Sequence, residues 1–191
     1  MEPSLKNPIK IGVSLFLLCY CVNCYSQKHL EYRLDAERSS INFEISHLSF
    51  LTVKGKFKKI SGSVVTNNNN IEYIHAKIAV NSIFTEDKTR DESLLGKAYL
   101  HAEKYPEITF KSVKINNQEG VLHGVLKIKN VEKKIAIPFT TSFVKNKHEI
   151  IITINTTVER KAFNLNFGTM DSFIGNRIHC QLKIQGSLLE N

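Results

Sequence analysis

The chain has 191 residues, a length typical of a single domain, and carries a formal net charge of +8 with no tryptophan. Its lysines alternate with apolar residues and form no block, and no motif of interleaved aromatic and basic residues occurs. These features exclude a typical nucleic-acid-binding protein and favour a solvated basic outer face. Attraction of that face to an anionic membrane surface is a second interpretation of the charge.

The N-terminal segment has a composition of its own. Two lysines precede an apolar run from Ile11 to Val22, and the small residues Cys24 and Ser26 follow it. This order is typical of a secretory signal peptide, so we predict a signal over residues 1–26 and an exported protein, periplasmic or secreted. The run is shorter than the roughly 20 apolar residues that span a membrane. A retained signal anchor and lipidation at Cys24 are the alternatives.

Three of the four cysteines lie in this segment, so the predicted mature domain, residues 27–191, keeps only Cys180. A single cysteine can form neither an internal disulfide nor a cysteine-based zinc site. Cys180 alternates with Ile178 and Leu182, which favours a small buried side chain. The stability of the domain must therefore come from an apolar core, which a chain of this length can supply.

From Leu30 onward, apolar and polar residues alternate with a period of two, the pattern of β-strands that bury one face. Around residues 40–47 this pattern places Ile41, Phe43, Ile45 and His47 on one face. Similar runs occur around residues 74–80, 122–128, 135–139, 150–154 and 178–184. Because β-branched residues dominate these runs, the sequence predicts an all-β domain.

Polar turn sequences separate the predicted strands. They include residues 67–70, which are four asparagines, residues 116–120, which end in glycine, and residues 145–147. Short polar turns join antiparallel neighbours, so the sequence predicts one antiparallel sheet system. In a single domain, several such strands must form a sandwich or close into a barrel.

One segment, residues 85–100, lacks alternation and predicts a helix. Thr85 or Asp87 can cap its N-terminus, and Gly96 can end it. Pro106 then stops any helix, and Glu107 begins a new strand pattern. We therefore expect one helical excursion in an otherwise all-β domain.

Short segments along the chain match one known family, and their order and spacing are specific. They are Tyr32–Asp35, Ser40–Phe43, Ser46-His47, Val53–Phe57, Ile60–Gly62, Asn81–Thr85, Arg90–Leu94, Tyr105–Ser112, Gly124–Val131, and Arg160 and Phe163 ahead of Phe167-Gly168. On these residues the chain resembles the YceI-like family of exported lipid-binding proteins, over essentially all of residues 30–189. It departs from the family at Asn130, where glycine is usual, and in residues 96–100, which often end in Phe-Leu.

The resemblance implies an extended antiparallel, lipocalin-like β-barrel of about eight strands, with a short helix covering one end. It also implies an apolar tunnel for a long-chain isoprenoid, either a polyisoprenoid or a quinone-like lipid. A barrel of this size is either filled by its own side chains or occupied by one small ligand, so inner apolar residues pack the core or line the tunnel. The candidates for ligand contact are Phe43, Ile45, Phe57, Leu94, Phe110, Phe139 and Phe163.

Polar residues near one end of the tunnel would hold the head of such a lipid. The candidates are His47, by its inward parity, Arg90 and Asp91 on the predicted helix, and Arg160. A guanidinium binds an oxyanion or phosphate well. The alternative interpretation is an internal Arg–Asp or His–Asp pair that fixes the helix to the barrel.

Catalytic motifs are absent from the sequence. The seven histidines show no metal-ligand spacing, no serine lies in a nucleophile elbow, and no glycine-rich phosphate loop occurs. We therefore predict a non-enzymatic lipid carrier or sequestering protein without metal or cofactor. The alternatives are a protein-interaction or stress-response module with a side-chain-filled barrel, or an enzyme acting on a lipid precursor. An exposed edge strand would also permit a homodimer.

Overall fold

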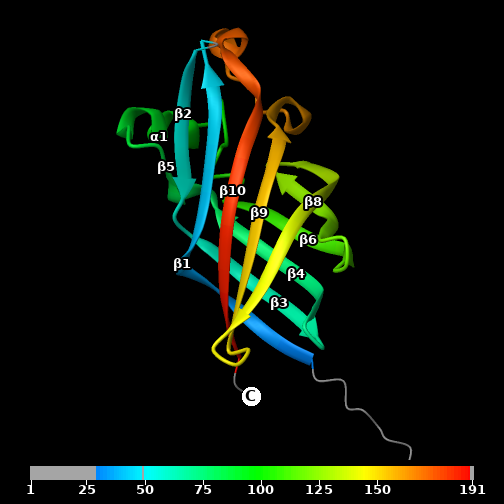
Figure 1. Ribbon diagram of the computed structural model, residues 1–191. Coiled ribbons are helices and arrows are strands. Elements are labelled where there is room, and N and C mark those ends of the chain that lie inside the picture. Colours follow the sequence, from blue (N-terminus) through cyan, green and yellow to red (C-terminus); the bar gives the residue numbers. More distant parts are fainter. Residues whose placement is uncertain (1–28, 49, 190–191) are drawn as a thin grey trace, which may run out of the picture.

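The computed structural model describes residues 29–48 and 50–189, so the predicted signal peptide and its cleavage site lie outside the described residues (Figure 1). The described chain is almost entirely β-structure. Its strands are β1 (His29–His47), β2 (Leu51–Phe57), β3 (Ile60–Asn67), β4 (Asn70–Ala79), β5 (Ile83–Phe84), β6 (Glu107–Asn116), β7 (Val121–Ile128), β8 (Val131–Val144), β9 (Glu149–Glu159) and β10 (Ile174–Leu188).

Eight of these strands close into an antiparallel barrel. They follow the order β1-β3-β4-β6-β7-β8-β9-β10, and the pairing of β10 with β1 completes the circle. The predicted all-β, eight-stranded barrel is therefore confirmed. The three predicted polar turns are confirmed as well, because they join β3 to β4, β6 to β7 and β8 to β9.

Strand β1 changes partner along its length. Its first residues, His29–Arg33, pair with β3, whereas Ile41–His47 pair with β2. Its other edge follows β10 throughout, with a break in register between Asp35 and Ser40. β2 and the short β5 thus extend the sheet beyond the barrel, and β1, β2 and β10 project together at the upper end in Figure 1.

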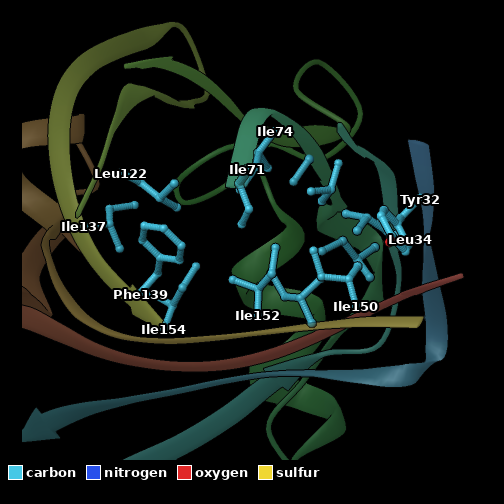
Figure 2. Close-up of a cluster of buried hydrophobic side chains, with 14 of the residues drawn as sticks. Tyr32, Leu34, Ile71, Ile74, Leu122, Ile137, Phe139, Ile150, Ile152 and Ile154 are labelled. Atoms are coloured by element: carbon cyan, nitrogen blue, oxygen red, sulfur yellow. The ribbon is translucent and has the colours of Figure 1, made fainter. Parts of the chain in front are cut away.

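Apolar side chains fill the opposite end of the barrel, near the turn between β8 and β9. Tyr32, Ile71 and Ile150 are completely buried there, and Figure 2 shows the cluster pointing inward from facing walls. The hydroxyl of Tyr32 donates a hydrogen bond of 2.9 Å to the carbonyl oxygen of Lys147 in that turn. This end of the barrel is closed by packing, and we call it the closed end.

A charged network at the closed end ties the irregular part of β1 to β9. Glu149 accepts hydrogen bonds from Lys145 Nζ at 2.7 Å and from Arg38 Nη1 at 2.5 Å. Arg38 Nε also donates to Asp35 Oδ2 at 2.6 Å. These bonds to cations hold the pKa of Glu149 below its ordinary value of 4.5 and that of Asp35 below 3.8.

The network predicts a specific loss of stability in acid. Because the folded-state pKa values are lowered, both carboxylates stabilise the fold above their unfolded pKa values of about 4, and this contribution is lost as pH falls further. The free energy of unfolding, measured by urea denaturation between pH 7 and pH 3, should fall less steeply for Glu149→Gln than for the unmodified protein. Equal slopes would contradict this account of the network.

The helix α1 (Lys88–Leu95) is half as long as the predicted helix of residues 85–100. It begins where expected, because the side chain of Asp87 accepts a hydrogen bond of 2.9 Å from the backbone N–H of Arg90. Gly96 is the C-cap, and the chain then forms tight turns in which the N–H groups of Tyr99 and His101 both donate to the carbonyl of Gly96. The predicted end at Gly96 is thus confirmed, whereas residues 97–100 of the predicted segment form these turns instead of helix.

Candidate ligand-binding cavity

The barrel encloses one long cavity of about 360 Å³, within the range of about 300–1,000 Å³ typical of small-molecule sites. Its walls are almost wholly aliphatic and aromatic, and the inner faces of the barrel strands provide most of them. The cavity contradicts the alternative of a barrel filled by its own side chains. The predicted inward parity is confirmed along β10, where Ile178, Cys180, Leu182 and Ile184 all line the cavity.

The cavity is elongated along the strands. On β10 it is lined from Ile174 to Ile184, a stretch of about 33 Å at the usual rise of about 3.3 Å per residue. It ends against Leu34 and Val64 beside the closed end, and its other end lies at His47 and Phe167. This second end, below the projecting part of β1, β2 and β10, is the mouth of the cavity.

Three of the five predicted aromatic candidates line the cavity: Phe43, Phe57 and Phe110. The rings of Phe43 and Phe57 lie 5.5 Å apart. Gly55, directly opposite Phe43 in the sheet, leaves room for that ring, because a Cβ there would collide with it. Gly124 makes room for the Phe110 ring in the same way. Glycine thus lets two aromatic rings lie flat against the cavity wall.

The other two aromatic candidates do not line the cavity. Phe139 is buried in the cluster that also contains Ile137 and Ile154 (Figure 2). Phe163 belongs to the short 3₁₀ helix η2 (Arg160–Phe163) and packs in a second apolar cluster, but it is not itself part of the lining. Both therefore stabilise the core in this structure, whereas the predicted Ile45 and Leu94 are part of the cavity wall.

His47 lines the cavity, as its parity predicts, and it lies at the mouth. Its Nε2 is buried and has no hydrogen-bond partner among the described residues. A buried polar atom without a partner costs about 1–3 kcal/mol, which a polar group of a ligand would offset. The Nε2 atom of His47 is therefore well placed to form a hydrogen bond with the polar head of a ligand.

Arg90 and Asp91 both bond to Thr85, a buried residue between β5 and α1. Arg90 Nε donates to the Thr85 hydroxyl at 2.8 Å, and Arg90 Nη2 donates to the Thr85 carbonyl oxygen at 2.6 Å. Asp91 Oδ1 accepts from the Thr85 N–H at 2.9 Å and from its hydroxyl at 2.6 Å. Asp91 lies outside the lining and fixes the helix, whereas Arg90 lines the cavity, and its Nη1 lies 3.9 Å from Asp87 Oδ2.

The fourth polar candidate, Arg160, is completely buried and does not line the cavity. Its guanidinium donates to the carbonyl oxygens of Leu165, Asp171, Ile174 and Gly175 at 2.7 to 3.0 Å. Its Nη1 also bonds to the carboxylate of Asp171 at 2.5 Å, which holds the pKa of that carboxyl far below its ordinary value. Because its donors are already engaged, Arg160 holds the loop between η2 and β10 and has no place in the candidate site.

Alternation of apolar and polar residues does not identify the parts of the wall that lie in irregular segments. Tyr99 and Leu100 come from the turns after α1, and Asn166 and Phe167 come from the loop that Arg160 holds. None of these positions has the period-two pattern that identifies an inner face. The only sequence signal at Phe167-Gly168 is its match to the family.

Cys180 faces the cavity from the middle of β10. Burial raises the pKa of its thiol to about 11, so the group is protonated at neutral pH and behaves as part of the apolar wall. Among the described residues, no three His, Cys, Asp or Glu side chains form a group that could hold a metal ion. Within the same residues, no helix is long and apolar enough to cross a membrane.

The chain is similar to several known proteins. UPF0312 proteins of Yersinia pestis and Yersinia enterocolitica are 30% and 32% identical over 141 residues, which cover 68% of this chain and 72% of each relative. Among solved structures, BcnA of Burkholderia cenocepacia has a TM-score of 0.71 at 22% identity, covering 80% of this chain and 98% of BcnA. This likeness shows the shared fold.

Two further solved structures have the same fold. A polyisoprenoid-binding domain from Saccharophagus degradans has a TM-score of 0.70 at 17% identity, covering 84% of this chain and 99% of that domain. The YceI protein of Campylobacter jejuni has a TM-score of 0.65 at 25% identity, covering 76% and 90% of the two chains. The family model of the YceI-like domain matches residues 32–186. The chain therefore belongs to the YceI-like family.

Proposed function

We propose that this protein binds a long-chain isoprenoid lipid, a polyisoprenoid or a quinone-like molecule, inside the cavity and performs no chemistry on it. The observation that carries the proposal is the long apolar cavity, which is closed at one end and bordered by polar groups at the other. The likeness to the polyisoprenoid-binding domain of Saccharophagus degradans supports the same class of ligand. We also propose that residues 1–26 direct export of the protein.

The shape of the cavity fits one apolar chain. Burial of apolar surface contributes about 25 cal/mol per Å², and this contribution does not depend on the direction in which the chain lies. The direction would be set at the mouth, where His47 Nε2 has no hydrogen-bond partner among the described residues and where Arg90 lines the cavity, with its Nη1 in a long ion pair of 3.9 Å with Asp87 Oδ2. The lipid head would lie there and the chain would extend toward Leu34.

The chemistry of the wall supports binding without catalysis. Its one thiol, Cys180, is protonated at neutral pH because burial raises its pKa to about 11. Arg90 is already bonded to Thr85 through two of its nitrogens. His47 would be the histidine of the wall that could act as acid or base, and Cys180 lies six residues along β10 from Ile174, the residue that pairs with His47.

Native mass spectrometry tests the proposal directly. The full chain is expressed in a host that makes isoprenoid lipids, purified without detergent and sprayed under non-denaturing conditions. We expect an additional mass that disappears on organic extraction, and an isoprenoid in the extract. The proposal would be overturned if the protein had only its bare polypeptide mass and also failed to take up an added prenol. An uptake of prenol that His47→Ala weakens would support the proposed position of the head.

A further inference from the structure

Large apolar side chains are exposed together at the projecting end of the molecule. The described residues contain six such side chains. Four of them lie in the turn between β1 and β2, at the first residue of β2 or in the 3₁₀ helix η3 (Gly168–Phe173): Phe50, Leu51, Met170 and Phe173. Phe50 is 81% exposed and Phe173 is 48% exposed. We call these four residues the apolar tip.

Backbone contacts hold the two parts of the tip together. The N–H of Leu48 donates a hydrogen bond of 2.7 Å to the carbonyl oxygen of Phe173, although the two residues lie far apart in the sequence. The contact between Arg160 and Asp171 holds η3 from the barrel side. The two segments that carry the tip, the turn between β1 and β2 and the helix η3, thus lie together at the upper end of the molecule in Figure 1.

The tip is continuous with the mouth of the cavity. His47 pairs with Leu51 on one side and with Ile174 on the other. His47 and Ile174 line the cavity, and Phe173 directly precedes Ile174. An apolar molecule that leaves the cavity at this end therefore meets the tip first.

We propose that the apolar tip inserts into the surface of a lipid bilayer, so that the isoprenoid passes between bilayer and cavity without crossing water. This inference rests on the proposed function, because such a ligand dissolves in the bilayer and is scarcely soluble in water. A convex cluster of aromatic and aliphatic side chains suits the fluid boundary between headgroups and acyl chains. Contiguous exposed apolar residues on a soluble domain are typical of such a contact.

Charges near the tip indicate that apolar contact, and not headgroup attraction, provides the binding. Three exposed basic residues on the elements next to the tip have an acidic neighbour: Lys54 lies opposite Glu44, Arg177 lies opposite Glu159, and Lys161 bonds to Asp171 at 3.0 Å. The tip should therefore insert into zwitterionic bilayers, with little dependence on salt.

The absence of tryptophan from the chain allows a direct test. Phe50→Trp and Phe173→Trp each place one tryptophan in the tip, and Val113→Trp, at a residue of β6 that is 72% exposed, is the matched control. The purified variants must share the same N-terminus, established by mass spectrometry. With phosphatidylcholine vesicles that carry brominated acyl chains, we expect quenching and a blue shift for the tip variants alone, at low and high salt. Equal quenching at Val113→Trp, or none at the tip, would overturn the proposal.

The rate at which the protein takes up prenol from vesicles tests whether insertion of the tip serves transfer of the ligand. The double variant Phe50→Asp/Phe173→Asp should take up a fluorescent prenol from vesicles about tenfold more slowly than the unmodified protein and Val113→Asp. Its equilibrium binding of prenol from cyclodextrin should be unchanged. If the tip variants were quenched but the protein bound no prenol, the proposed function would be overturned and the insertion of the tip into the bilayer would still hold. Prenol binding without quenching, or a concentration-dependent dimer lost in the double variant, would overturn the tip proposal alone.

Discussion

Replacing Arg160 with methionine is expected to lower the free energy of unfolding by about 3 kcal/mol or more. The guanidinium is completely buried and bonds to four backbone carbonyl oxygens and to Asp171. Methionine is long enough to occupy part of the space but donates no hydrogen bond. Because an unpaired buried carbonyl costs about 1–3 kcal/mol, the loop can keep its conformation only at a large loss of stability.

Urea denaturation followed by circular dichroism measures this change. Lys161→Met is the matched control, because Lys161 bonds to the same Asp171 but is 53% exposed, and its effect should stay within about 0.5 kcal/mol. The loop also carries Asn166 and Phe167 of the cavity wall, so Arg160→Met should weaken ligand binding as well. If Arg160→Met and Lys161→Met lost similar amounts of stability, burial of the Arg160 guanidinium would not be the reason for its contribution to the free energy of unfolding.

The second large effect is expected from Cys180→Trp, which should weaken lipid binding by about ten- to a hundredfold. Cys180 faces the middle of the cavity, so an indole there would occupy space that the lipid chain needs, at a cost of about 1–3 kcal/mol. Stability should change less, because the cavity offers room for the larger side chain.

His179→Trp is the matched control, since His179 is the preceding residue of the same strand and is exposed on the outer face. Its binding curve for a fluorescent prenol should coincide with that of the unmodified protein. If both variants bound the prenol equally well, the lipid would not lie in the cavity beside β10. The fluorescence emission wavelength of each introduced tryptophan also shows whether its indole is buried or exposed to water.

The inner face of the barrel was predictable because the period of a strand is two. Alternation alone assigned His47, Phe43 and Ile45 to the inside, and the cavity confirms this placement. Alternation cannot say how deep a residue lies along the barrel axis. Phe110 and Phe139 look equivalent in sequence, yet one lines the cavity and the other is packed in the core.

Polar candidates were less predictable, since the role of an arginine depends on its acceptors. The acceptors of Arg160 are mainly backbone carbonyls of a loop that has no recognisable pattern. The alternative interpretation for these residues is an internal Arg–Asp or His–Asp pair that fixes the helix to the barrel. In the structure Thr85 makes this link, because it accepts a hydrogen bond from Arg90 and donates one to Asp91. A small hydroxyl residue at a helix boundary gives no sequence signal beyond its capping potential.

The pairing of the first strand with the last determines when the cavity comes into existence. Tyr32 pairs with Leu188 and Ile41 pairs with Leu182, so the wall beside β10 is open until the C-terminal strand has joined the N-terminal one. Contacts between such distant residues form slowly, because closing a long loop costs entropy before any contact is gained. A nascent chain emerging from a ribosome or a secretion channel has no closed cavity. We therefore expect lipid to be captured only by the completed and folded chain.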